Sequence, residues 1–78
     1  MKRILIVDDE TDITTPLRIG LERQGYEVQT CNYPIDAISN FKPGFFDILI
    51  LDIRMPKMSG FDLYRELRKK EKRGYFSS

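Results

Sequence analysis

The stretch ILIVDDE at residues 4–10 has the strongest influence on the predicted fold, because four apolar residues are followed at once by three acidic ones. A short, unbroken apolar run is typical of a strand that is buried on both faces of a sheet. A second run, ILIL at residues 48–51, has the same form and is followed by Asp52. Two such strands indicate a sheet with helices on both of its faces.

The first of the intervening segments predicts an amphipathic helix over about residues 12–24, closed by Gly25. Its apolar stripe comprises Ile13, Leu17, Gly20 and Leu21. Pro16 falls within this segment and is tolerated only in the first turn of a helix, where a missing N–H costs little. In residues 26–31, polar side chains alternate with less polar ones, a pattern that favours an edge strand over a central one.

The second half of the chain continues the alternation of strands and helices. A short helix begins near Pro34 and ends before Gly44, and a longer helix over about residues 60–72 follows Ser59 as its N-cap. Their inward-facing residues are expected to be Ala37, Ile38 and Phe41, and Leu63, Tyr64 and Leu67. Glu66 and Lys70 are expected to pair on the outer surface. The order β-α-β-α-β-α predicts a parallel α/β sheet with right-handed crossovers.

Composition excludes several function classes. The chain has 78 residues, which suffices for one small domain, and its formal net charge of +1 argues against a strongly basic nucleic-acid binder. It has no His and one Cys, Cys31, which excludes an imidazole base, a His-ligated metal and an internal disulfide. Its apolar runs are far shorter than the roughly 20 residues of a membrane span. We therefore expect a small, soluble, cytoplasmic protein.

Three carboxylates are candidates for a metal site. Asp8 and Asp9 end the first strand and Asp52 ends the third, and ligands of open α/β sheets bind at these carboxyl ends. If the two strands are neighbours, the three negative charges repel one another unless a cation lies between them. Oxygen ligands alone favour Mg²⁺, with Mn²⁺ as an alternative. Without Asp52, the Asp8–Asp9 pair could equally be helix-capping or loop acids.

The sequence resembles the receiver domain of two-component response regulators. The resemblance rests on residues 7–10 (VDDE), the strand that ends at Asp52, and the loop MPKMSG at residues 55–60. It covers residues 2–72, the N-terminal part of such a domain, and leaves residues 73–78 as a tail. It implies a partial flavodoxin-like fold in which three parallel strands have the order 2-1-3 with flanking helices.

The resemblance also implies a function. Asp52 would accept a phosphoryl group from the phosphohistidine of a sensor histidine kinase, in a phosphorelay module that is not itself an enzyme. Asp9 would ligate Mg²⁺ directly, Asp8 would act largely through water, and the Arg54 backbone carbonyl would be a further ligand, beside Asp52. Neither nucleic acid nor a membrane is an expected partner.

The sequence departs from the family in length. A receiver has five βα units and only three are found here, so strands 4 and 5 and their helices are missing. The switch Ser/Thr and the Lys that follow those strands have no counterpart, and Lys57 is not expected to replace that Lys. The chain is therefore expected to be a fragment or a truncated product, without switch function of its own.

Two other functions remain open. A degenerate receiver could bind another protein, or a second copy, through the exposed edge of its third strand without being phosphorylated. A small Mg²⁺-dependent phosphatase or nucleotide binder is less favoured, because no Gly-rich loop follows the first strand. The basic run at residues 68–73 is interpreted as a solvated helix end, and Cys31 as a strand residue.

Overall fold

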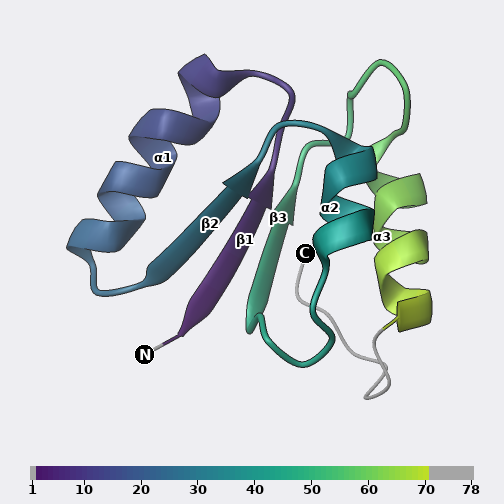
Figure 1. Cartoon of the computed structure of the whole chain (residues 1–78). Coiled ribbons are helices and arrows are strands. Elements are labelled where there is room, and N and C mark those ends of the chain that lie inside the picture. Colours follow the sequence, from purple (N-terminus) through teal and green to yellow (C-terminus); the bar gives the residue numbers. More distant parts are fainter. Residues whose placement is uncertain (1, 71–78) are drawn as a thin grey trace.

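The computed structural model describes residues 2–70, in which three strands alternate with three helices (Figure 1). The strands are β1 (Arg3–Val7), β2 (Glu27–Cys31) and β3 (Ile48–Leu51). The helices are α1 (Thr11–Arg23), α2 (Pro34–Asn40) and α3 (Gly60–Lys70). The predicted order is confirmed. The expected extension of the last helix to residue 72, and the tail at residues 73–78, lie outside the described residues.

The strands form one parallel sheet in the order β2-β1-β3, as the resemblance implied. Val7, the last residue of β1, lies opposite Cys31 of β2 and Leu51 of β3. The carboxyl ends of all three strands are therefore level with one another. Figure 1 shows α1 on one face of the sheet and α2 and α3 side by side on the other.

The main hydrophobic core lies between the sheet and the pair α2 and α3. It comprises Leu5, Val7, Ala37, Phe41, Leu49, Met55, Leu63 and Leu67. Successive strand residues point to opposite faces, so Ile4 and Ile6, which are also buried, lie on the face opposite Leu5 and Val7. The prediction of helices on both faces is therefore confirmed for β1. For β3 it is wrong within the described residues, because α1 packs against β2 and β1 and leaves Ile48 and Ile50 only half-buried.

The predicted buried stripe of α1 is wrong in part. Ile13 and Leu17 are 50% and 36% exposed, Gly20 is exposed, and the buried residue of the helix is Thr14. The reason is that α1 packs against β2 and β1, and the part of this face over β3 is left uncovered among the described residues. The apolar periodicity showed which side of the helix is apolar. It did not show which part of that side packs against the sheet.

Two local expectations are also corrected. Pro16 lies inside α1 beyond its first turn, because the helix begins at Thr11. Proline has no backbone N–H, so the helical hydrogen bond from residue 16 to the Asp12 carbonyl is absent. Glu66 pairs with Lys69 at 3.1 Å rather than with Lys70. The Lys70 ammonium instead donates to the Ile38 carbonyl, which ties α3 to α2.

The predicted cap of α3 is confirmed, since the Asp62 N–H donates to Ser59 Oγ at 3.2 Å. Within residues 2–70, none of the helices combines the length and the hydrophobicity that a membrane crossing requires.

Candidate functional site

The structure brings Asp8, Asp9 and Asp52 together at the carboxyl ends of β1 and β3. Each offers one carboxylate oxygen, and these three atoms lie within 4.8 Å of one another. We call these residues the acidic cluster. Their proximity follows from the sheet order, because β1 and β3 are hydrogen-bonded neighbours and end at the same level. Their roles as metal ligands and phosphoryl acceptor stay predictions.

The backbone of the acidic cluster is held by the sheet. The Asp52 N–H donates to the Val7 carbonyl at 2.9 Å, and the Asp8 N–H donates to the Cys31 carbonyl at 3.1 Å. Both bonds continue the strand pairing beyond the last strand residue. The position of each carboxylate relative to the other is therefore set by sheet geometry rather than by a flexible loop.

The side chains of the cluster are oriented by short local hydrogen bonds. The Glu10 N–H donates to Asp8 Oδ1 at 2.9 Å, and the Arg54 N–H donates to Asp52 Oδ1 at 3.1 Å. Both link a carboxylate to the N–H two residues later, the pattern of an Asx-turn. Such turns restrain the carboxylate rotamers, so the cluster is ordered by the chain's own groups.

The electrostatics of the cluster favour a cation. Burial raises the pKa of the Asp8 carboxyl above its ordinary value, and the negative charges of Asp52 and Asp9 raise it further, while the hydrogen bond from the Glu10 N–H opposes these effects. Desolvation and like charges both disfavour the ionised form. A divalent cation between the three carboxylates would offset the repulsion between their negative charges.

Two residues support the cluster from outside through contacts that the sequence did not predict. Asn32 Nδ2 donates to the Asp8 carbonyl at 2.9 Å and so joins the ends of β2 and β1. Gly60 starts α3 directly against the strand end, where an added Cβ would lie 2.5 Å from the Asp52 carbonyl oxygen. In the sequence, the only sign of this close approach is that a glycine, Gly60, follows Asp52 at a short distance.

Arg54 and Lys57 belong to the loop that follows β3. Arg54 is exposed, and its N–H is already bonded to Asp52. Its carbonyl as a metal ligand stays a prediction. Lys57 lies with Asp9 on the wall of a pocket of about 290 Å³ beside the acidic cluster.

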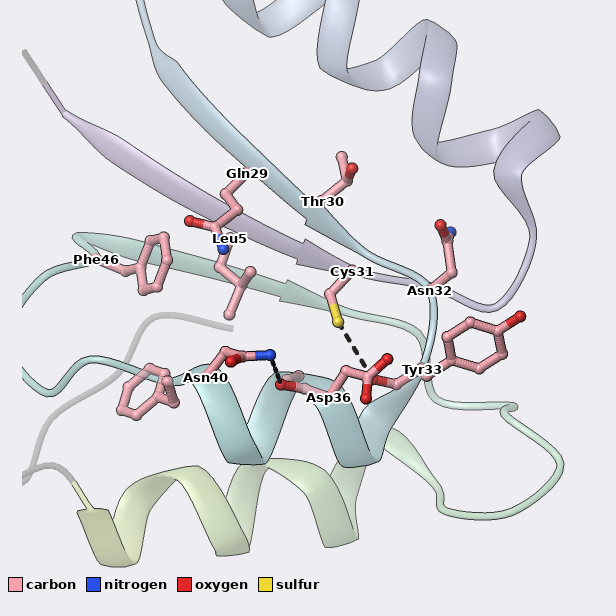
Figure 2. Close-up of a pocket in the computed structure, with 11 residues that line it drawn as sticks. Leu5, Gln29, Thr30, Cys31, Asn32, Tyr33, Asp36, Asn40 and Phe46 are labelled. Atoms are coloured by element: carbon pink, nitrogen blue, oxygen red, sulfur yellow. Dashed lines mark hydrogen bonds between the residues drawn. The ribbon is translucent and has the colours of Figure 1, made fainter.

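A second pocket, of about 330 Å³, lies between β2 and α2 and contains no member of the cluster (Figure 2). Cys31 Sγ donates to the Tyr33 carbonyl at 3.2 Å, and Asn40 Nδ2 donates to the Asp36 carbonyl at 3.0 Å. Cys31 is half-buried at the end of an edge strand, and its thiol is engaged with the chain's own backbone.

A paramagnetic metal should locate the site. We expect Mn²⁺ to broaden the backbone NMR signals of Asp9, Asp52 and Arg54 first, because these residues surround the predicted site. Broadening confined to helix carboxylates such as Glu22 and Glu66 would contradict the assignment.

The raised pKa of Asp8 should also make metal binding depend on pH. Protons compete with the cation, so the apparent Mn²⁺ affinity should begin to fall at a pH above the ordinary titration range of Asp. In the metal-free chain the native state binds this proton more tightly than the unfolded state does. The contribution of Asp8 to the free energy of unfolding should therefore rise, not fall, as the pH drops through its raised pKa. NMR titration of Asp8 and urea melts at several pH values measure both effects.

Comparison with known proteins agrees with this geometry. The family model of the response regulator receiver domain matches residues 4–75. The chain is 37% identical over 70 residues to the alkaline phosphatase synthesis transcriptional regulatory protein PhoP of Bacillus subtilis, a match that covers 90% of this chain and 29% of PhoP. The chain thus spans less than a third of the length of this relative.

Solved structures give the same result. The response regulator TrrA of Thermotoga maritima in complex with Mg²⁺-BeF has a TM-score of 0.84 and 43% identity, over 97% of this chain and 66% of TrrA. A crystal structure of the histidine kinase ThkA in complex with TrrA matches with the same TM-score, identity and coverage.

Proposed function

We propose, on the premise that this chain belongs to the family of response regulator receiver domains, that Asp52 accepts a phosphoryl group from a sensor histidine kinase in the presence of Mg²⁺. The observation that carries the proposal is the acidic cluster, whose three carboxylate oxygens lie within 4.8 Å of one another at two adjacent strand ends. The TrrA complexes with Mg²⁺-BeF and with a histidine kinase support it.

The donor set fits a hard divalent cation. Asp8, Asp9 and Asp52 offer carboxylate oxygens, and the Arg54 carbonyl is the proposed fourth protein ligand. Oxygen ligands without nitrogen or sulfur are those that Mg²⁺ prefers, and it keeps several waters when bound. Asp9 would bind directly and Asp8 largely through water. When bound, the cation neutralises negative charge on the phosphoryl oxygens.

The chain's own residues supply the nucleophile and its orientation. An Asp52 carboxylate oxygen forms a bond to phosphorus while the bond between phosphorus and the kinase imidazole nitrogen breaks, and that nitrogen keeps the electron pair. The Val7 carbonyl holds the Asp52 backbone and the Arg54 N–H orients its carboxylate. The chain takes up one phosphoryl group and does not turn over, as suits a signalling module.

A small phosphoryl donor tests this proposal without a cognate kinase. Incubation of the 78-residue chain with acetyl phosphate and Mg²⁺ should give an intact mass with one phosphoryl adduct, and EDTA should prevent it. Absence of any adduct would contradict the proposal and favour a phosphorylation-independent interaction module. Hydrolysis of the donor without an adduct would contradict it in favour of a phosphatase.

In this proposal, residues 2–72 are the N-terminal part of a receiver domain and residues 73–78 are a tail. The chain would act in the cytoplasm, where a kinase that uses ATP can reach it. Neither nucleic acid nor a membrane is a partner in this proposal.

A second candidate function is self-association through the free edge of β3. Among the described residues β3 pairs only with β1, and it contains no charge, proline or bulge of the kind that protects natural edges. A cavity of about 380 Å³ beside this strand is lined by Leu51, Ile53, Gly60, Phe61 and Tyr64. Phe61 is 65% exposed there.

This second function predicts that the chain associates as its concentration rises, which light scattering after size exclusion measures. Phe61→Glu should reduce the association, because it places a charge on the apolar surface beside β3. Ile35→Glu, an exposed position on α2, is the matched control. A single monomeric species at every concentration, with a cooperative urea transition, would exclude edge pairing.

A further inference from the structure

The pocket beside the acidic cluster has walls that suit an organic ring. It lies between the loop that leads into α2 and the loop that follows β3, and we call it the loop pocket. Its lining residues are Asp9, Asn32, Tyr33, Pro34, Met55, Pro56 and Lys57. It shares Asp9 with the acidic cluster, so a molecule bound there lies next to the proposed phosphorylation site.

Tyr33 is the main aromatic surface of the loop pocket. The residue is 68% exposed, and in Figure 2 its ring is turned away from Cys31 and Asp36. Met55, by contrast, is only 6% exposed and anchors the opposite wall in the core. An apolar cavity of about 150 Å³ already holds a benzene molecule, and the loop pocket has a volume of about 290 Å³. It therefore has room for one planar ring.

Lys57 adds a positive charge to this pocket. It is exposed and has no hydrogen bond or ion pair within residues 2–70. A cation at the wall of an apolar pocket, beside carboxylates that favour Mg²⁺, suits a ligand that has a ring and an anionic group next to it.

We propose that the loop pocket binds the planar ring of an aromatic acyl phosphate, so that Tyr33 favours donors that have a ring and Lys57 assists the departure of the carboxylate in the reaction at Asp52. Tyr33 stacks on the ring, and Lys57 pairs with the carboxylate that leaves. In the reaction an Asp52 oxygen bonds to phosphorus, the bond between phosphorus and the acyl oxygen breaks, and that oxygen leaves with the electron pair as a carboxylate. The inference rests on the proposed phosphoacceptor function.

Benzoyl phosphate and acetyl phosphate form a matched pair of donors, because both release a carboxylate and only one has a ring. The measurement is the ratio of the phosphorylation rates of the chain with the two donors and Mg²⁺, followed by intact mass. Tyr33→Ala should lower the ratio of benzoyl to acetyl rates about three- to tenfold, by loss of one ring contact. Ile35→Ala, exposed and outside the pocket, should leave the ratio unchanged. An unchanged ratio in Tyr33→Ala would overturn the inference.

Lys57→Gln tests the positive charge of the pocket separately from the stacking of Tyr33 on the ring. It should slow the reaction of both donors, since both release an anion, while the ratio between them changes little. An unchanged rate with both donors would show that Lys57 has no role in the pocket.

A binding measurement keeps the inference distinguishable from the proposed function. Benzoylphosphonate has a stable carbon–phosphorus bond and cannot transfer its phosphoryl group. Its addition should move the backbone NMR signals of Tyr33, Met55 and Lys57, and Tyr33→Ala should weaken this binding. Tyr33 lines both this pocket and the one between β2 and α2, so the shifts of Met55 and Lys57 are decisive. Shifts confined to α1 or to residues that line only the second pocket, such as Gln29 and Asn40, would overturn the inference. If benzoylphosphonate binds at the loop pocket while acetyl phosphate gives no adduct at Asp52, the pocket is supported and the phosphoacceptor role is contradicted.

Discussion

Replacement of Asp52 with Asn is expected to abolish phosphorylation of the chain by acetyl phosphate. The amide is not a nucleophile toward phosphorus, and the substitution also removes one of the three carboxylates of the acidic cluster. The expected effect is complete loss of the phosphoryl adduct in the intact mass, not a reduced rate. The weaker Mn²⁺ binding of the same variant should be visible as reduced NMR broadening at Asp9.

Asp47→Asn is the matched control for this prediction. Asp47 precedes β3, at the opposite end of the strand from Asp52, and its carboxylate accepts a hydrogen bond from the Arg3 N–H at 2.9 Å. Its loss should leave the adduct in place. A persistent adduct in Asp52→Asn, or its disappearance in Asp47→Asn, would show that the acceptor has been wrongly assigned.

Gly60→Ala is expected to destabilise the fold by about 1–3 kcal/mol, the usual range for overpacking a close contact. The added Cβ would lie 2.5 Å from the Asp52 carbonyl oxygen and 2.9 Å from its carbonyl carbon, which are backbone atoms held by the sheet. A small domain has only a few kcal/mol of net stability. Urea melts should therefore show a large shift of the midpoint, together with displacement of the Asp52 signals.

Gly20→Ala is the comparison that isolates this contact. Gly20 lies inside α1 with no atom within 4 Å of an added Cβ, so the substitution should stabilise the helix by about 0.5–1 kcal/mol. The two variants make the same chemical change and should move the midpoint in opposite directions. A Gly60→Ala melt that overlays the Gly20→Ala melt would contradict the close packing of α3 on the strand end.

Features with a strong local pattern could be predicted from the sequence. The apolar runs identified β1 and β3, and the alternation of elements indicated a parallel sheet. The order β2-β1-β3, however, came from the resemblance to receiver domains rather than from any single strand. Given that order, the convergence of Asp8 and Asp52 follows from two strands that end at the same level.

Features that depend on tertiary neighbours could not be predicted. The apolar side of α1 is periodic, yet Ile13 is half-exposed and Thr14 is buried, because the sheet beneath the helix is only partly covered. Lys70 satisfies the Ile38 carbonyl of α2 instead of its neighbour Glu66, a choice that requires α2 and α3 to lie side by side. The loop pocket likewise forms from two loops far apart in the sequence.

The most direct test of the phosphoacceptor assignment is to locate the phosphoryl group. After reaction with acetyl phosphate and Mg²⁺, borohydride reduction converts an aspartyl phosphate to homoserine, and peptide mass spectrometry identifies the converted position. Conversion is expected at Asp52 alone, and at no residue when EDTA removes the metal. Conversion at Asp47 or Asp8, or no conversion at any residue, would contradict the assignment.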